Sequence, residues 1–170
     1  MNRPSIPASR SAKGRRRGQA LAEFAIVFPV FILLIVAAID IGRGVFAYNS
    51  ITNAAREGAR LAIVNQDVAL ITQRATQQTA IAEISSPNIR VTFWESTSTP
   101  NPNALSGDCS PVGFGCQALV RFETTYQPIT PIIKNILFPG GVTLVATSVE
   151  TVEFTCPNTT TTAGNCPKQP

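Results

Sequence analysis

The junction at Gly18 constrains the fold more than any other feature of this 170-residue chain. Six positive charges and no acidic residue precede Gly18, and Glu23 is the single charge between Gly18 and Ile39. The sixteen uncharged residues of 24–39 make about 24 Å of helix at ~1.5 Å per residue. With its flanks this segment is long enough to cross a hydrocarbon core of about 30 Å. We therefore predict a transmembrane helix over residues 19–41, with Pro29 inside it.

The net charge of +4 belongs to the N-terminal tail and not to a folded surface. From Gln19 onward the chain has eight basic and ten acidic residues, a net charge of −2. Positive charge beside an apolar span stays in the cytoplasm, which predicts a cytoplasmic N-terminus and an extracytoplasmic C-terminal part. No basic patch with interleaved aromatic residues follows, so a nucleic-acid partner is not expected. The basic residues 1–17 contain Pro4, Pro7 and Gly14, which predicts disorder.

Glu23 stands out because a lone carboxylate in a membrane helix is costly. The cost is roughly 2.5–3.5 kcal/mol at the bilayer centre and less near the interface. An ionisable group in such a place indicates a functional role. The simpler alternative is an interfacial Glu23 that reaches lipid headgroups or Arg17.

The helical pattern continues beyond the membrane segment to about Val64. Asp40 and Arg43 are spaced to pair on one helix face, as are Glu57 and Arg60. Small residues recur at three- and four-residue spacing along this part, which lets another helix or a sheet approach closely. The stripe comprises Ile51, Ala54, Ala55, Gly58, Ala59 and Ala62. Packing on the chain's own sheet and packing on another subunit are both open.

The remaining sequence predicts an α+β fold with a long N-terminal helix, a second amphipathic helix and a small antiparallel sheet of about three strands. The second helix is expected from an N-cap at Asp67 to about Ile84. Strands are expected at 89–94, 117–127 and 142–154, with a long loop at 95–115 and a short helix or turn within 128–138. The predicted organisation is a leader at 1–18, the membrane helix at 19–41, an outer α+β domain at 42–154 and an irregular tail at 155–170.

All four cysteines lie in the last third of the chain, beyond the apolar segment. This position indicates an oxidising compartment and two disulfides. Three pairings are possible. We favour Cys109–Cys116 and Cys156–Cys166, because each would close a loop locally, and four free thiols are the alternative.

The composition argues against catalysis and against a metal. The chain has no histidine, the commonest general base and a frequent metal ligand. The cysteine spacings do not match zinc sites, and no nucleophile elbow or phosphate loop occurs. We therefore expect no enzyme activity, no cofactor and no small-molecule substrate.

Three segments together resemble the TadE-like (TadE/TadG) pseudopilins of the tight-adherence, Flp-type (type IVc) pilus system. The first is Gly18 followed by Glu23 and Phe24 at the head of the apolar helix. The second is the string at 53–60, Asn-Ala-Ala-Arg-Glu-Gly-Ala-Arg, and the third joins 126–131 to 142–147. The resemblance covers roughly residues 18–154. The predicted disulfide loops are not part of the family pattern.

The resemblance implies cleavage between Gly18 and Gln19 by a prepilin peptidase of the inner membrane. It also implies that Glu23 meets the free N-terminal amine of a neighbouring pilin. Partners would be other pilins or pseudopilins, assembly-platform proteins, the peptidase and membrane lipid. The expected role is that of a minor pseudopilin or assembly protein, either retained in the cell membrane or incorporated into a surface pilus. The residues expected to take part in helix packing and assembly are Ala54, Ala55, Arg56, Glu57, Gly58, Ala59 and Arg60.

Two other interpretations fit the N-terminal region. A secretory signal peptide cleaved after Ala38 would release a soluble domain beginning at Ile39. An uncleaved bitopic protein would instead keep its anchor and use the outer domain to bind a partner.

Overall fold

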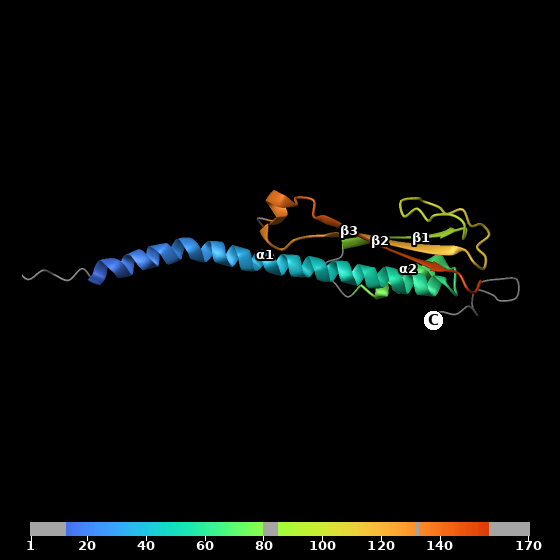
Figure 1. The fold of residues 1–170 in the computed structure, drawn as a ribbon, viewed down its shortest axis with the longest axis horizontal. Helices are drawn as coiled ribbons and strands as arrows, with labels where there is room; N and C mark the ends of the chain where they lie inside the picture. The colour runs from blue at the N-terminus through green and yellow to red at the C-terminus, as the bar shows by residue number, and fades with distance from the viewer. Residues whose placement is uncertain (1–12, 80–84, 132, 157–170) are drawn as a thin grey trace, which may run out of the picture. The chain divides into compact units, whose positions relative to one another are not determined.

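The computed structural model describes residues 13–79, 85–131 and 133–156. Its elements follow in the order α1 (Lys13–Ala62), α2 (Val68–Gln77), β1 (Ser85–Trp94), β2 (Gln117–Tyr126), a short π-helix η1 (Ile133–Leu137) and β3 (Val142–Thr151) (Figure 1). The predicted α+β class is confirmed, with a long apolar helix, a second short helix and three antiparallel strands. The chain divides into two compact units, residues 1–39 and 40–170.

Helix α1 begins earlier than the sequence indicates. Residues 13–17 of the basic leader are already helical, while 1–12 lie outside the described residues. Lysine and arginine are good helix formers, and both prolines of the leader precede Lys13. The prediction of disorder is therefore wrong for residues 13–17.

Helix α2 has the predicted N-cap and a shorter length than expected. The Asp67 carboxylate accepts hydrogen bonds from the amides of Ala69, at 2.9 Å, and Leu70, at 3.5 Å. These bonds satisfy amides that have no partner within the helix. The helix ends at Gln77 rather than near Ile84, and residues 80–84 lie outside the described residues.

The three strands form a meander in the order β1-β2-β3, with both pairs antiparallel. Alternation along β2 places Val120, Phe122 and Thr124 on the buried face, as the sequence pattern indicates. Strand β1 starts at Ser85, four residues before the predicted Ile89, and its register shifts between Ser85 and Asn88. Strand β3 ends at Thr151, three residues before the predicted end.

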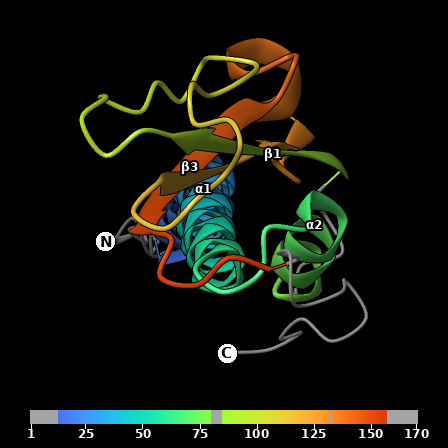
Figure 2. The same ribbon diagram turned by 90° about the vertical axis from the view of Figure 1, so that its right-hand side faces the viewer.

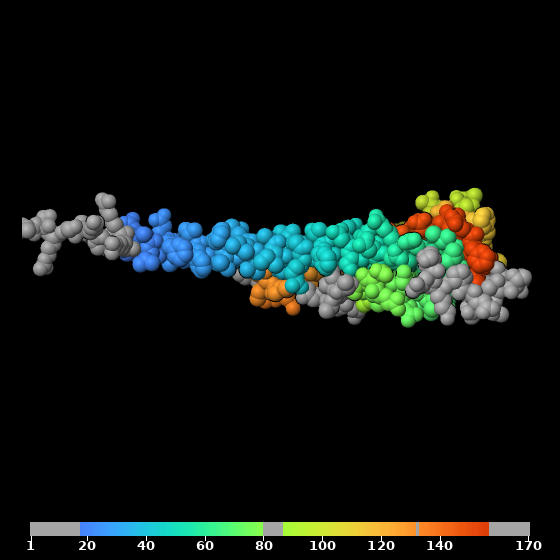
Figure 3. Space-filling view, turned by 90° about the horizontal axis from the view of Figure 1, so that it is seen from below, coloured from blue at the N-terminus to red at the C-terminus, as the bar shows by residue number. Residues whose placement is uncertain are grey.

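The buried face of the sheet covers residues 40–62 of α1, and α2 lies on the flank of this helix (Figures 2 and 3). Two apolar clusters make the core. One includes Ala59, Leu61, Ile71 and Val120, and the other joins Ile51 to Phe122. The second half of α1 therefore packs against the sheet, which is one of the two arrangements that the sequence leaves open.

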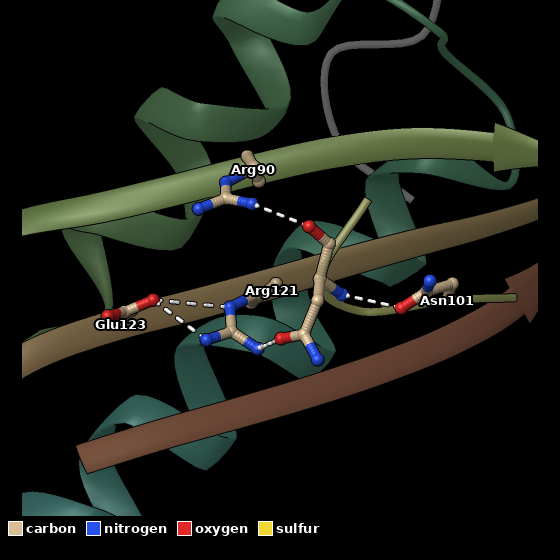
Figure 4. Close-up of polar contacts among 5 residues, drawn as sticks. Arg90, Asn101, Arg121 and Glu123 are labelled. Carbon is tan, nitrogen blue, oxygen red and sulfur yellow. Dashed lines mark hydrogen bonds and ion pairs between the residues drawn. The ribbon is translucent and has the colours of Figure 1, made fainter. Parts of the chain in front are cut away.

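The loop between β1 and β2 is held against the sheet by polar contacts. The Arg90 guanidinium donates to the main-chain oxygen of Asn103 at 3.4 Å, and Arg121 donates to the Asn103 side-chain oxygen at 3.0 Å (Figure 4). Arg121 also pairs with Glu123 at 2.8 Å. This contact offsets the repulsion between Arg90 and Arg121, which are directly opposed across the strands.

A second set of contacts closes the start of the same loop. The Asp108 carboxylate accepts hydrogen bonds from the Ser98 hydroxyl and from the Glu95 amide. These bonds hold the pKa of the Asp108 carboxyl below its usual range. At Gly107 an added Cβ would lie 1.8 Å from the Phe93 main-chain oxygen, so only glycine allows this approach to β1.

Candidate processing and assembly site

The predicted membrane segment has the surface of a helix that is not buried in its own protein. Helix residues 18–62 include a stretch long and apolar enough to cross a membrane. From Leu21 to Ile35 the large apolar side chains are exposed, for example Ile26 at 74% and Leu34 at 62%. Phe24 and Phe28 stack on each other with their ring centres 5.2 Å apart. Such a surface is typical of a single membrane span or of a signal segment.

The predicted processing residues Gly18, Gln19, Glu23 and Phe24 all lie on α1 and are exposed. A Cβ added at Gly18 would have no heavy atom within 4 Å. Gln19 and Glu23 are four residues apart and therefore share one helix face. Among the described residues, no side chain forms an ion pair or hydrogen bond with Glu23.

The small-residue stripe packs inside the chain's own C-terminal unit, residues 40–170. Ala54, Ala55 and Ala59 are fully buried, in the clusters that α1 makes with α2 and the sheet. Gly58 is the tightest point, because an added Cβ would lie 3.2 Å from both Ala75 Cβ and Val120 Cγ1. The sequence does not decide what the stripe packs against. In the structure it packs against α2 and the sheet of the same chain.

The charged residues of the same motif lie around the stripe. Glu57 pairs with Arg60 at 3.3 Å, as its i,i+3 spacing indicates, and with Arg74 of α2 at 3.6 Å. Arg56 is exposed, and the Arg60 side chain is 59% exposed. The motif thus has a buried apolar side that holds the domain together and a charged side open to solvent.

Asp40 has a role that the sequence does not reveal. Its carboxylate accepts hydrogen bonds from the amides of Ile129, at 3.1 Å, and Thr130, at 2.9 Å. The Tyr126 hydroxyl donates to the Asp40 main-chain oxygen at 3.1 Å. The predicted local partner, Arg43, contributes an electrostatic attraction. No local pattern signals contacts to residues 86 to 90 positions away.

The cysteines follow the local pairing as far as the structure describes them. Cys109 and Cys116 form a disulfide with a Cα–Cα distance of 6.3 Å. Cys156 is buried, and its main-chain amide donates to the Gln66 side chain at 2.7 Å. Its predicted partner Cys166 lies outside the described residues, so the pairing Cys156–Cys166 stays a prediction. Within the described part of the chain, no group of three or more metal-ligating side chains occurs.

A comparison with protein families agrees with the first two of the three sequence motifs, and the third motif, at 126–147, lies outside the matched residues. The family model described as TadE-like protein matches residues 18–60, from the junction glycine to the end of the charged motif. No curated protein and no solved structure is detectably similar to the chain. This family belongs to a pilus system and is generally non-enzymatic. Residues 18–60, which comprise the exposed apolar segment and the helical half of the core, are a TadE-like protein family domain.

Proposed function

We propose that this chain is a minor pseudopilin or pilus-assembly protein of a tight-adherence (Flp-type) pilus system. The observation that carries the proposal is the family match over residues 18–60. The match starts at the charge junction and covers an exposed apolar helix that holds one acidic residue. The protein acts by assembly in the cell membrane, with its C-terminal domain outside the cytoplasm, and its partners are other pilins and the assembly platform.

Processing takes place between Gly18 and Gln19, with Glu23 and Phe24 contributing to recognition by the prepilin peptidase. This bond lies inside α1, so the peptidase must open the first turns of the helix. Glycine lowers the cost of opening, because it destabilises a helix interior by about 0.8–1.0 kcal/mol relative to alanine. Cleavage removes six positive charges that hold the helix at the cytoplasmic surface.

Glu23 then docks the subunit to a neighbour. Cleavage creates an ammonium group at Gln19, and the Glu23 carboxylate has no partner among the described residues. An opposite charge from an adjacent subunit offsets the cost of a carboxylate in an apolar bundle. After cleavage Glu23 also lies in the first turns of the helix, where the macrodipole favours a negative charge by about 0.3–1 kcal/mol.

The outer domain contributes through the surface of the 54–60 motif. Ala54, Ala55, Gly58 and Ala59 set the shape of this part by packing the helix on its own sheet. Arg56, Arg60 and the partly exposed Glu57 remain available for neighbouring subunits. We assign assembly contacts to these charged side chains.

The test of processing is the N-terminal residue of the mature protein, measured by mass spectrometry on membranes of its native host. The proposal expects a start at Gln19 in the wild type and an uncleaved leader in Gly18→Leu. Normal cleavage of Gly18→Leu would refute the peptidase site. A start at Ile39 would identify a secreted domain, and an intact Met1 a permanent membrane anchor.

The test of docking is co-purification with the other pilins after Glu23→Ala. We expect membrane insertion to be unchanged and co-purification to fall. Glu153→Ala is the matched control, because it removes an exposed carboxylate from the outer domain. Equal co-purification of both variants would refute the docking role of Glu23.

A further inference from the structure

An exposed apolar surface lies on the connection between β2 and β3. Among the described residues of this connection, four large apolar side chains are exposed: Ile129 at 54%, Ile136 at 75%, Leu137 at 62% and Phe138 at 45%. We call these four residues the base patch. Several apolar side chains exposed on one short connection indicate a binding surface, since single exposed residues are common and need no explanation.

The base patch is held next to the point where the apolar segment of α1 ends. Asp40, whose carboxylate binds the amides of Ile129 and Thr130, directly follows Ile39, the last residue of the uncharged stretch. The connection is therefore fixed by two charge-assisted hydrogen bonds to the first polar residue after that stretch. If the apolar segment spans the membrane, this residue marks the depth at which the chain leaves the hydrocarbon.

The charge around the base patch also fits a lipid surface. Between Glu123 and Glu150 the chain has no acidic residue and one basic residue, Lys134. The Asp40 carboxylate is already engaged by the loop amides. A cation among exposed apolar side chains matches an anionic headgroup layer above acyl chains.

A hollow beside the patch extends the same surface. It has a volume of about 380 Å³ and is lined by Gly44, Tyr48, Tyr126, Phe138 and Leu144 among others. Tyr48 is 48% exposed, and tyrosines are enriched where proteins meet the membrane interface. Apolar side chains, a tyrosine and a lysine thus occur together at this end of the outer domain.

We propose that the base patch lies in the interfacial layer of the lipid bilayer and anchors the outer domain to the membrane surface. The proposal rests on membrane insertion of the apolar segment, which is part of the proposed function. A lipid surface is favoured over a second copy of the chain because of the hydrogen bonds to Asp40. They keep the patch beside the residue that follows the uncharged stretch, wherever other subunits lie.

The experiment measures contact with lipid by tryptophan quenching. The full chain is reconstituted into phosphatidylcholine–phosphatidylglycerol vesicles that carry brominated acyl chains. Trp94, the only tryptophan, is replaced by phenylalanine, and one tryptophan is introduced per variant. Ile136→Trp reports on the base patch. Leu137→Trp reports on the same patch from a second position, so that the result does not depend on one substitution. Phe114→Trp is the matched control, because Phe114 is 81% exposed but lies in the disulfide loop, and Phe31→Trp reports on the span itself.

We expect brominated lipid to reduce the emission of the Phe31→Trp variant and of both base-patch variants, and to leave that of Phe114→Trp unchanged. Quenching of Phe31→Trp without quenching of Ile136→Trp and Leu137→Trp would overturn the base-patch proposal and leave membrane insertion intact. Blue-shifted but unquenched emission from both base-patch variants would also overturn it, in favour of burial against a second copy of the chain. If Phe31→Trp itself is not quenched, the apolar segment is not inserted, and the proposed function fails as well.

Discussion

Gly58 offers the sharpest test of how the outer domain is packed. Gly58→Ala adds one methyl group at a point 3.2 Å from Ala75 Cβ and 3.2 Å from Val120 Cγ1. Both separations are shorter than the favourable carbon–carbon distance of about 3.5–4.0 Å. Ile71, Ala75 and Val120 are themselves fully buried, so they have little room to move.

The expected change in the free energy of unfolding follows from comparing two glycines of one helix. Gly42 also lies in α1, and a Cβ there meets nothing within 4 Å. Gly42→Ala should therefore raise the free energy of unfolding by about 1 kcal/mol through helix propensity alone. Gly58→Ala has the same propensity gain but an overpacking cost of about 1–3 kcal/mol. We expect Gly58→Ala to be less stable than Gly42→Ala by about 1–3 kcal/mol on these grounds.

The assay is urea unfolding of the full chain in detergent micelles, followed by Trp94 fluorescence. Equal stabilisation by the two alanine substitutions would refute the close packing of α1 on α2 and β2. It would also reopen the alternative that the small-residue stripe is kept free for another subunit. A lower unfolding midpoint of Gly58→Ala than of wild type, at unchanged slope, would support the intramolecular packing.

Three further predictions concern aspartates. Asp40→Ala removes both acceptors of the Ile129 and Thr130 amides and should speed hydrogen exchange at these amides. Equal protection of the two amides in Asp40→Ala and wild type would contradict the role of Asp40 in anchoring the connection between β2 and β3. Asp67→Ala removes the N-cap of α2 and should lower the free energy of unfolding by about 0.5–2 kcal/mol, as measured by urea unfolding. Asp67→Asn should be nearly neutral, because asparagine is also a good N-cap. Equal losses of stability in both variants would contradict a capping role. Asp108 has a lowered pKa in the folded state, so its contribution to stability is complete above its unfolded pKa and is lost as the pH falls through the folded value. The protection factor of the Glu95 amide, which is corrected for the intrinsic pH dependence of exchange, should therefore fall in acid for wild type and show no such step in Asp108→Asn. Identical pH profiles of the protection factor in the two proteins would refute the link.

The sequence predicts the elements whose signals are local. The long helix through the uncharged stretch 24–39, the N-cap at Asp67 and the alternation along β2 each depend on neighbours within a few residues, and all three appear in the structure. The disulfide Cys109–Cys116 closes a short loop and is predictable for the same reason.

What the sequence does not predict depends on contacts between distant residues or on competing local effects. Asp40 has a plausible local partner in Arg43, and nothing nearby indicates that amides some 90 residues later are the partners it binds. The basic leader suggests disorder through its charge, yet the helix propensity of lysine and arginine prevails from Lys13 onward. At Ser85, serine and proline point to a turn, but pairing with β2 extends the strand through an irregular register.

The contact between Gly58 and Val120 also bears on how the protein is made. Ribosomes add about 5–20 residues per second, and Val120 lies 62 positions after Gly58 in the chain. The small-residue stripe is therefore synthesised roughly 3–12 s before the strand that covers it exists, at the elongation rates above. During that interval the nascent helix presents the same surface to any other nascent helix or chaperone. Synthesis and folding of β2 must therefore be faster than association of this helix with a wrong partner.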